Sequence, residues 1–128
     1  MTRCELLAND ERMATLTVTE QNFQEIIGRG GIILLDFWAA WCGPCRSFSP
    51  IFEKVSETHP KIVFGKVDTE SEQQLAAAFE VRSIPTLTVF REGILLFSQG
   101  GALPEKALEE LIAKVSELDI NQVRASIS

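Results

Sequence analysis

The stretch DFWAAWCGPCRSF, from Asp36 to Phe48, contains two cysteines three residues apart, Cys42 and Cys45. It overlaps the near-continuous apolar run at residues 32–38, which is typical of a central strand buried on both faces. Behind the cysteines, apolar residues at positions 48, 51, 52 and 55 have helical spacing. The cysteine pair is therefore expected at a junction where a buried strand ends and a helix begins.

The rest of the chain alternates between strand and helix patterns. Strands are predicted at residues 14–18, 32–38, 61–68, 86–90 and 94–98, the last two as a hairpin around the turn REG. We expect four helices: one capped by Thr19, one after the cysteines and kinked by Pro50, one capped by Ser71 with Gln74, and one beginning at Pro104. The last has a predicted buried stripe formed by Leu108, Leu111, Ile112, Val115 and Leu118.

This order of elements, β-α-β-α-β-α-β-β-α, predicts the fold class. Strands alternating with helices favour an α/β fold in three layers, α/β/α. The central sheet should be mixed, with about five strands flanked by about four helices, because the hairpin adds an antiparallel edge. The segment after Asp119 has no pattern that predicts an element.

Composition and charge restrict the kinds of protein this chain can be. Its 128 residues suffice for one domain, predicted at 13–128, behind a polar, aperiodic stretch at 1–12 that we expect to be a flexible N-terminal extension. A net charge of −6 argues against nucleic-acid binding. No apolar run reaches the roughly 18 residues that span a bilayer, and the N-terminus does not resemble a signal peptide. Three cysteines are too few for a disulfide scaffold, which favours the reducing cytoplasm.

The position of the cysteines favours redox chemistry. A helix N-terminus favours negative charge and lowers the pKa of a thiol by about one unit, which promotes the reactive thiolate. Cys45 lies one turn beyond Cys42 on the same helix face, close enough for a disulfide to open and close. A zinc site formed by Cys4, Cys42, Cys45 and His59 is a weaker alternative, since no second CxxC is present. A purely structural disulfide would close almost no loop and stabilise little.

Asp36 is unusual because a carboxylate in a buried strand is costly unless it is protonated or paired. Burial should raise its pKa, and such a group, six residues before Cys42, could accept a proton from the second thiol. A solvent-facing position at the sheet edge is the simpler alternative. Lys66 could supply a nearby ammonium, although a solvated strand end is also possible.

Four motifs in order, DFWAAWCGPC, KVD, SIPT and GGALP, resemble the thioredoxin family over about residues 14–118. The resemblance implies a general protein disulfide reductase without a cofactor of its own or a metal. Cys42 would attack a substrate disulfide, Cys45 would resolve the mixed disulfide, and Asp36, with Lys66 as its partner, would accept the proton through a water. A thioredoxin reductase using NADPH would restore the dithiol.

The resemblance also implies a shallow apolar docking surface for disulfide-containing substrate proteins on a cytoplasmic monomer. Pro85 would be cis, and the backbone of Ile84 would pair with an extended substrate segment. The expected docking residues are Trp41, Gly43, Pro44, Ile84, Pro85, Gly101 and Ala102. An oxidant or isomerase of the same fold is the first alternative, disfavoured by the Gly-Pro dipeptide between the cysteines. A binding module whose redox state is unimportant is the second.

Overall fold

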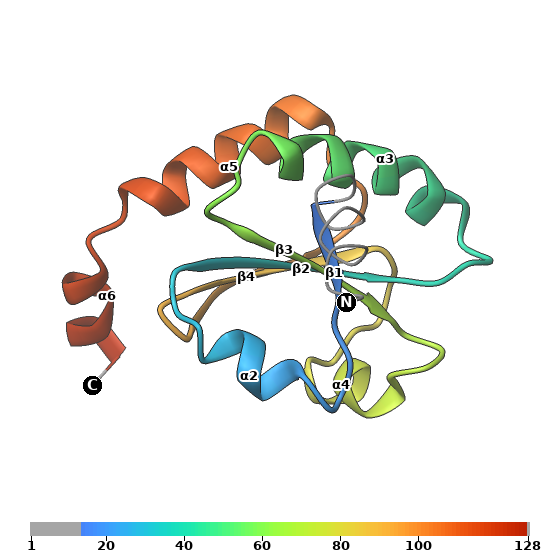
Figure 1. Cartoon of the computed structure of the whole chain (residues 1–128), viewed down its shortest axis with the longest axis horizontal. Coiled ribbons are helices and arrows are strands. Elements are labelled where there is room, and N and C mark those ends of the chain that lie inside the picture. Colours follow the sequence, from blue (N-terminus) through green and yellow to red (C-terminus); the bar gives the residue numbers. More distant parts are fainter. Residues whose placement is uncertain (1–13, 128) are drawn as a thin grey trace, which may run out of the picture.

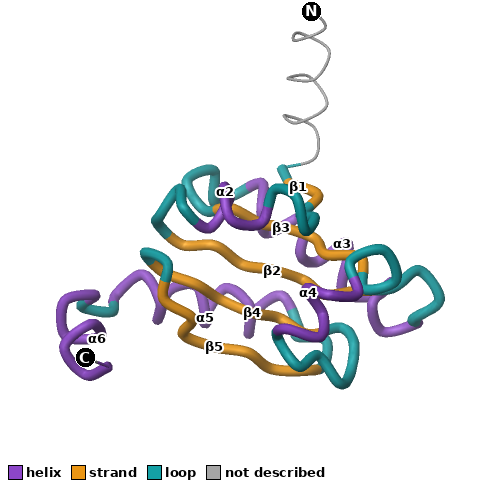
Figure 2. Tube along the Cα trace, turned by 90° about the horizontal axis from the view of Figure 1, so that it is seen from below, coloured by secondary structure: helices purple, strands orange, loops and turns teal. Residues whose placement is uncertain are grey.

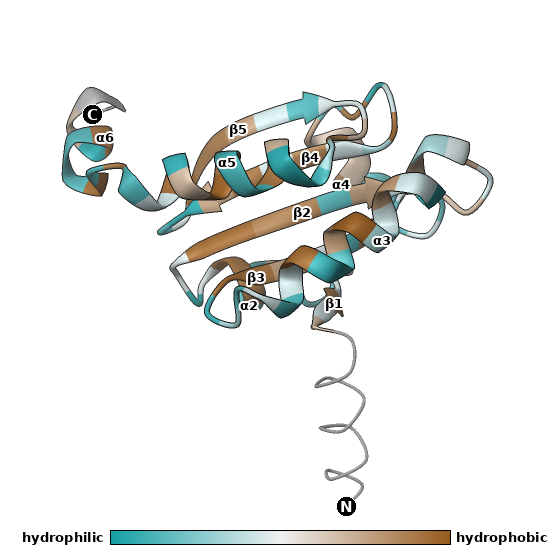
Figure 3. Ribbon diagram, turned by 90° about the horizontal axis from the view of Figure 1, so that it is seen from above, coloured by the Kyte–Doolittle hydropathy of each residue, from teal (hydrophilic) through white to brown (hydrophobic). Residues whose placement is uncertain are grey.

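Strand β2 (Ile32–Trp38) lies in the middle of the sheet, with strands paired on both of its edges. The chain is seen here in a computed structural model that describes residues 14–127. Five of the seven residues of β2 are buried, as its apolar sequence predicts. Figure 3 shows this strand as hydrophobic over most of its length.

The sheet is mixed and has the strand order β1-β3-β2-β4-β5 (Figure 2). The first three strands in this order are parallel, and β4 and β5 add antiparallel pairings beside β2. The predicted five-stranded mixed sheet is therefore confirmed. The other strands are β1 (Thr15–Thr17), β3 (Val63–Asp68), β4 (Thr86–Arg91) and β5 (Ile94–Gly100).

Helices cover both faces of the sheet, so the predicted three-layer architecture is also confirmed (Figure 1). On one face lie α3 (Gly43–Glu57) and α5 (Glu105–Glu117), which share a buried apolar cluster with β2, β3 and β4. On the other face lie α2 (Phe23–Ile27) and α4 (Gln73–Ala78), which bury Ile26 and Leu75 in a second cluster. Alternation along β2 sends Leu34 and Asp36 to the α3 face, and Leu35 and Phe37 to the other.

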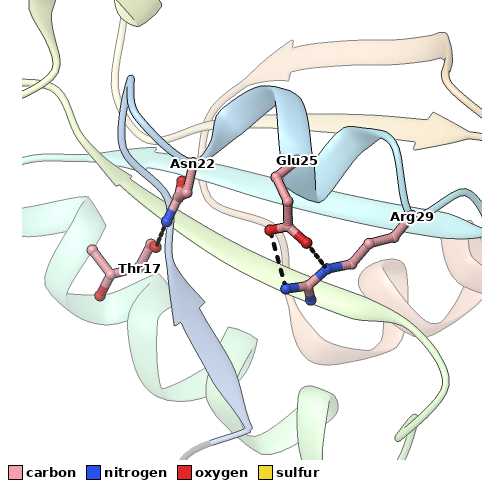
Figure 4. A network of polar contacts seen from close by, with 4 residues as sticks. All are labelled: Thr17, Asn22, Glu25 and Arg29. Carbon is pink, nitrogen blue, oxygen red and sulfur yellow. Dashed lines mark hydrogen bonds and ion pairs between the residues drawn. The ribbon is translucent and has the colours of Figure 1, made fainter.

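The segment before α2 is held by polar contacts with neighbouring residues (Figure 4). The helix begins at Phe23, later than expected, although Thr19 Oγ1 accepts a hydrogen bond from the backbone N–H of Asn22 at 3.3 Å, the contact expected of a capping Thr. The Asn22 side chain donates to the carbonyl oxygen of Thr17 at 3.0 Å. One helical turn later, the guanidinium of Arg29 pairs with Glu25 at 3.1 Å.

The predicted capping box of α4 is wrong. The hydroxyl of Ser71 donates to Asp68 Oδ2 at 3.3 Å instead of capping the helix. The backbone N–H of Gln74 donates to Glu20 Oε2 at 3.1 Å, so a carboxylate distant in sequence takes the capping role. Sequence spacing does not reveal this contact because it joins two loops brought together by the sheet.

The C-terminal part differs from prediction in two ways. Leu118 is 40% exposed, because α5 ends one residue earlier, at Glu117. Of the predicted stripe, Leu108, Ile112 and Val115 are buried. A further helix, α6 (Ile120–Ile127), follows α5 at one side of the molecule (Figure 1). The expected extension at residues 1–12, with Cys4, lies outside the described residues. Within residues 14–127, no helix is long and apolar enough to cross a membrane.

Candidate active site

Cys42 and Cys45 form a disulfide at the N-terminus of α3. Cys42 is the N-cap residue, and its extended backbone ends the loop from β2. Its Sγ accepts a hydrogen bond from the backbone N–H of Cys45 at 3.1 Å, and the two Cα atoms are 5.2 Å apart. Both side chains are at least 95% buried. The backbone N–H of Cys45, in the first helical turn, therefore points at Cys42 Sγ, where it would stabilise a thiolate.

Two loops distant in sequence lie beside the pair. The carbonyl oxygen of Ile84 is 3.6 Å from Cys42 Sγ, and the Ile84–Pro85 peptide bond is cis, as expected. The backbone N–H of Gly101 donates to the carbonyl oxygen of Pro85 at 2.8 Å, with Gly101 at a φ of 105° that favours glycine. The end of β5 is thus tied to the loop before β4 next to the cysteines.

Exposed residues surround the buried disulfide on its outer side. Trp41 is 67% exposed, and its Nε1 donates to Glu70 Oε2 at 3.2 Å, which orients the ring. Gly43, Pro44 and Ala102 are also exposed. The seven expected docking residues lie in three segments, 41–44, 84–85 and 101–102. The structure therefore brings these three segments to the same end of the sheet.

Asp36 is fully buried, six residues before Cys42 and on the same face of the sheet as α3. Neither of its carboxyl oxygens has a hydrogen-bond partner among the described residues. Burial raises the pKa of Asp36 from 3.8 to about 7, and the positive charge of Lys66 opposes part of this rise. The alternative of a solvent-facing Asp36 is therefore wrong. Near neutral pH this carboxyl can both hold and release a proton.

Lys66 lies beside Asp36 in the register of β2 and β3. Its ammonium nevertheless donates to Ser49 Oγ and lies 3.5 Å from Glu53 Oε2, both on α3. It also lies 5.4 Å from the centroid of the Trp38 ring, within cation–π range. Lys66, the expected partner of Asp36, is thus close enough to act on Asp36 through its charge. The hydrogen bond and the ion pair of Lys66, however, are formed with α3.

A small cavity of about 100 Å³ lies between α3 and the sheet. Cys45, Ser49 and Lys66 line it together with Trp38, and it is large enough to hold water. Arg46 also borders the cavity, and its Nη1 donates to the carbonyl oxygen of Ala40 at 2.8 Å. Cys45 therefore lines this cavity, whereas Cys42 faces the loop at Ile84.

The sequence reasoning missed Ser49, Glu53 and Glu70. Ser49 and Glu53 follow Cys45 at intervals of four residues, so they share its helix face. That spacing was a usable signal, but it does not reveal that Lys66 turns toward α3. The contact of Glu70 with Trp41 has no signal in sequence, because it joins two loops at the ends of β2 and β3.

The geometry does not support the zinc alternative. His59 follows the far end of α3, roughly 22 Å along the helix from Cys42 at about 1.5 Å per residue. Its Nε2 lies 2.8 Å from Glu109 Oε1. No group of three or more His, Cys, Asp or Glu side chains that could hold a metal occurs within the described part of the chain.

Comparison with known proteins gives consistent similarities. The model of the family described as Thioredoxin matches residues 14–114. A Streptomyces coelicolor relative is 46% identical over 115 residues, which cover 90% of this chain and 86% of the relative. The thioredoxin of Bacillus subtilis is 38% identical over 103 residues, covering 80% and 98%. A solved mutant thioredoxin from Halobacterium salinarum superposes with a TM-score of 0.76 at 33% identity, covering 82% of this chain and 93% of that chain.

Proposed function

The chain belongs to the thioredoxin family and is a thiol–disulfide oxidoreductase with a redox-active pair at Cys42 and Cys45, and from this premise we propose how it works and what supplies its electrons. The proposed cycle reduces disulfides in other proteins and is driven by NADPH through a thioredoxin reductase. The observation that carries the proposal is the Cys42–Cys45 disulfide at the start of α3, with the N–H of Cys45 directed at Cys42 Sγ.

Cys42 is the proposed nucleophile and Cys45 the resolving thiol. The helix N-terminus stabilises the Cys42 thiolate, which faces the loop where a substrate would dock. The thiolate attacks one sulfur of a substrate disulfide, forms a mixed disulfide and releases the other substrate sulfur as a thiolate. Cys45, deprotonated, then attacks Cys42 Sγ, forms the internal disulfide and releases the second substrate thiolate. Two electrons have passed from the chain to the substrate.

Asp36 is the proposed acceptor of the Cys45 proton. Its pKa of about 7 makes it a base of suitable strength near neutral pH. The proton would pass through water in the cavity that Cys45 and Lys66 line, and Lys66 is the neighbour of Asp36 in the sheet. Lys66 is the proposed electrostatic partner that keeps the ionised carboxylate tolerable in the core.

The surface around Trp41 is the proposed docking site for substrate proteins. An exposed aromatic ring beside a reactive sulfur gives a flat apolar contact. An extended substrate segment would pair with the backbone of Ile84, and the carbonyl of that residue already faces Cys42. The remaining proposed contacts are Gly43, Pro44, Pro85, Gly101 and Ala102.

The proposed partners are thioredoxin reductase and disulfide-containing proteins, with the chain acting as a monomer in the cytoplasm. A compartment that contains NADPH and the reductase would keep the dithiol reduced between cycles. Nucleic acid and membrane are not proposed as partners, consistent with the net charge of −6.

The test is reduction of the insulin disulfides, first with dithiothreitol and then with NADPH and a thioredoxin reductase. The proposal predicts turnover with both donors, and none for the Cys42→Ser, Cys45→Ser double variant. Activity with dithiothreitol alone would contradict the proposed electron donor. A folded wild-type protein inactive with both donors would contradict the reductase proposal as a whole.

A further inference from the structure

The ammonium of Lys66 is held by two side chains of α3 that the cycle above does not use. Ser49 Oγ accepts a hydrogen bond from Lys66 Nζ, and Glu53 Oε2 lies 3.5 Å from the same nitrogen. Ser49 also donates to Glu53 at 3.5 Å, so the three groups are joined. Lys66 is only 18% exposed, whereas Glu53 is 36% exposed. We call Ser49 and Glu53 the α3 clamp.

Lys66 has two sets of possible partners, the α3 clamp and the carboxyl of Asp36. Asp36 and Lys66 are adjacent in register, and both side chains lie on the α3 face of the sheet. The Asp36 carboxyl oxygens have no hydrogen-bond partner within residues 14–127, while the cation beside them is bound elsewhere. A buried polar group normally takes an available partner, so an arrangement that withholds one requires a cause.

We propose that Ser49 and Glu53 are positioning residues that hold the Lys66 ammonium on the α3 side of the cavity, away from Asp36, and so set the charge that acts on the proton acceptor. The catalytic consequence rests on the proposed role of Asp36, but the positioning itself does not. The clamp keeps Asp36 able to take and return a proton near neutral pH instead of leaving it permanently ionised by a direct ion pair.

The charged and titratable groups facing Asp36 define the direction of the effect. β3 supplies Lys66, the one charge among the described residues that acts measurably on the Asp36 carboxyl, and α3 supplies Glu53, which pairs with Lys66. Arg46 and the Cys45 sulfur, also on α3, line the cavity that Lys66 borders. The side chains that α5 buries on this face are apolar. Loss of the clamp would free Lys66 to approach Asp36, and an ammonium close to a carboxylate favours the ionised form. Weakening the clamp should therefore lower the pKa of Asp36.

The test is a titration of the Asp36 carboxyl carbon by ¹³C NMR in the oxidised, full-length protein. We expect Glu53→Gln and Ser49→Ala each to lower the pKa of Asp36 by about half a unit or more, since an opposite charge at close range lowers a carboxyl pKa by roughly 1–3 units. Ser49→Ala is the sharper probe because it changes no charge. Glu57→Gln, one turn further along α3, and Ser47→Ala are exposed matched controls that should leave the value unchanged.

A second comparison separates positioning from simple charge removal. In a Lys66→Met background, Glu53→Gln and Ser49→Ala should lose most of their effect, because there is no ammonium left to release. An unchanged Asp36 titration in Ser49→Ala, or a shift in Glu53→Gln that is fully retained with Lys66→Met, would overturn the proposal. Both variants change partly exposed positions, and an intact spectrum verifies that each remains folded.

The same variants separate this inference from the proposed role of Asp36. If the inflection in the pH profile of insulin reduction moves with the Asp36 titration, both proposals are supported. If the titration moves and the rate profile does not, the clamp stands and Asp36 is not the proton acceptor. If neither moves, the clamp is overturned, and the role of Asp36 is then decided by its own substitution.

Discussion

Asp36 and Lys66 are neighbours on β2 and β3, yet the ammonium of Lys66 forms its ion pair with a carboxylate on a different element. Asp36 is fully buried, and this burial raises the pKa of its carboxyl to about 7, while the charge of Lys66 opposes part of the rise. The Asp36 proton is therefore exchanged in the pH range where the thiols are expected to react.

Asp36→Asn should stabilise the protein at alkaline pH. Because the pKa of Asp36 rises from 3.8 to about 7 on folding, the stability contributed by the neutral carboxyl is fully present below about pH 4 and is lost as the pH rises through 7. The difference amounts to about 4 kcal/mol, at about 1.4 kcal/mol per pKa unit. Urea unfolding of the oxidised proteins should show equal stabilities near pH 4 and a variant more stable by up to this amount at pH 8. A gap that does not change with pH contradicts the prediction, and exposed Glu110→Gln serves as the control.

The same substitution should slow disulfide reduction. In the proposed cycle an ionised Asp36 accepts the Cys45 proton, so the wild-type rate should rise with pH through about 7. Asp36→Asn should lose this rise and fall about 10- to 100-fold at pH 7.5, since a positioned general base commonly contributes about 10² or more. Stopped-flow reduction of insulin across pH 5–9 measures the profile. A variant that keeps the wild-type inflection would leave Asp36 with a structural role only.

Substitution of Cys45, but not of Cys42, should trap mixed disulfides between this chain and its substrate proteins. Cys45→Ser retains the nucleophile without the resolving thiol, so mixed disulfides with substrate proteins should accumulate. Cys42→Ser should neither reduce nor trap substrates. Both variants belong in a Cys4→Ser background, so that a trapped species can be assigned by mass spectrometry to one thiol. Trapping by Cys42→Ser and not by Cys45→Ser would reverse the assigned roles.

Trp41 should affect substrate docking more than chemistry. Its ring is 67% exposed and oriented by Glu70. Trp41→Ala should raise the KM for insulin about fivefold, which corresponds to about 1 kcal/mol, since an aromatic contact is worth about 0.5–1.5 kcal/mol. Reduction of a small aromatic disulfide, which needs little docking surface, should be nearly unchanged. Leu95→Ala, at another exposed apolar side chain on β5, is the matched control. Equal losses for insulin and the small disulfide would contradict a docking role.

The fold was largely predictable because its determinants are periodic and local. The apolar run of β2 and the turn between β4 and β5 gave strand positions that differ from the observed bounds by at most two residues. The cysteine pair was also predictable, since a CxxC between a strand and a helix has few other uses. Helix starts were less predictable, because the actual cap of α4 comes from Glu20.

The side-chain contacts of Lys66 could not be predicted from the sequence, because they also depend on tertiary packing. Lys66 has carboxylates on two elements within range, and sequence does not tell which one its flexible side chain approaches. The answer depends on how closely α3 packs on the sheet and on the hydroxyl of Ser49. Such choices between competing partners are made by tertiary packing, not by spacing along the chain.

The reduction potential of the Cys42–Cys45 pair tests the central claim most directly. Equilibration with dithiothreitol or glutathione buffers, followed by alkylation and mass spectrometry of the Cys4→Ser protein, measures it. We expect about −270 mV, which is the known value for thioredoxin itself and suits a reductant. A potential near about −120 mV, typical of a strong dithiol oxidant, would contradict the reductase function.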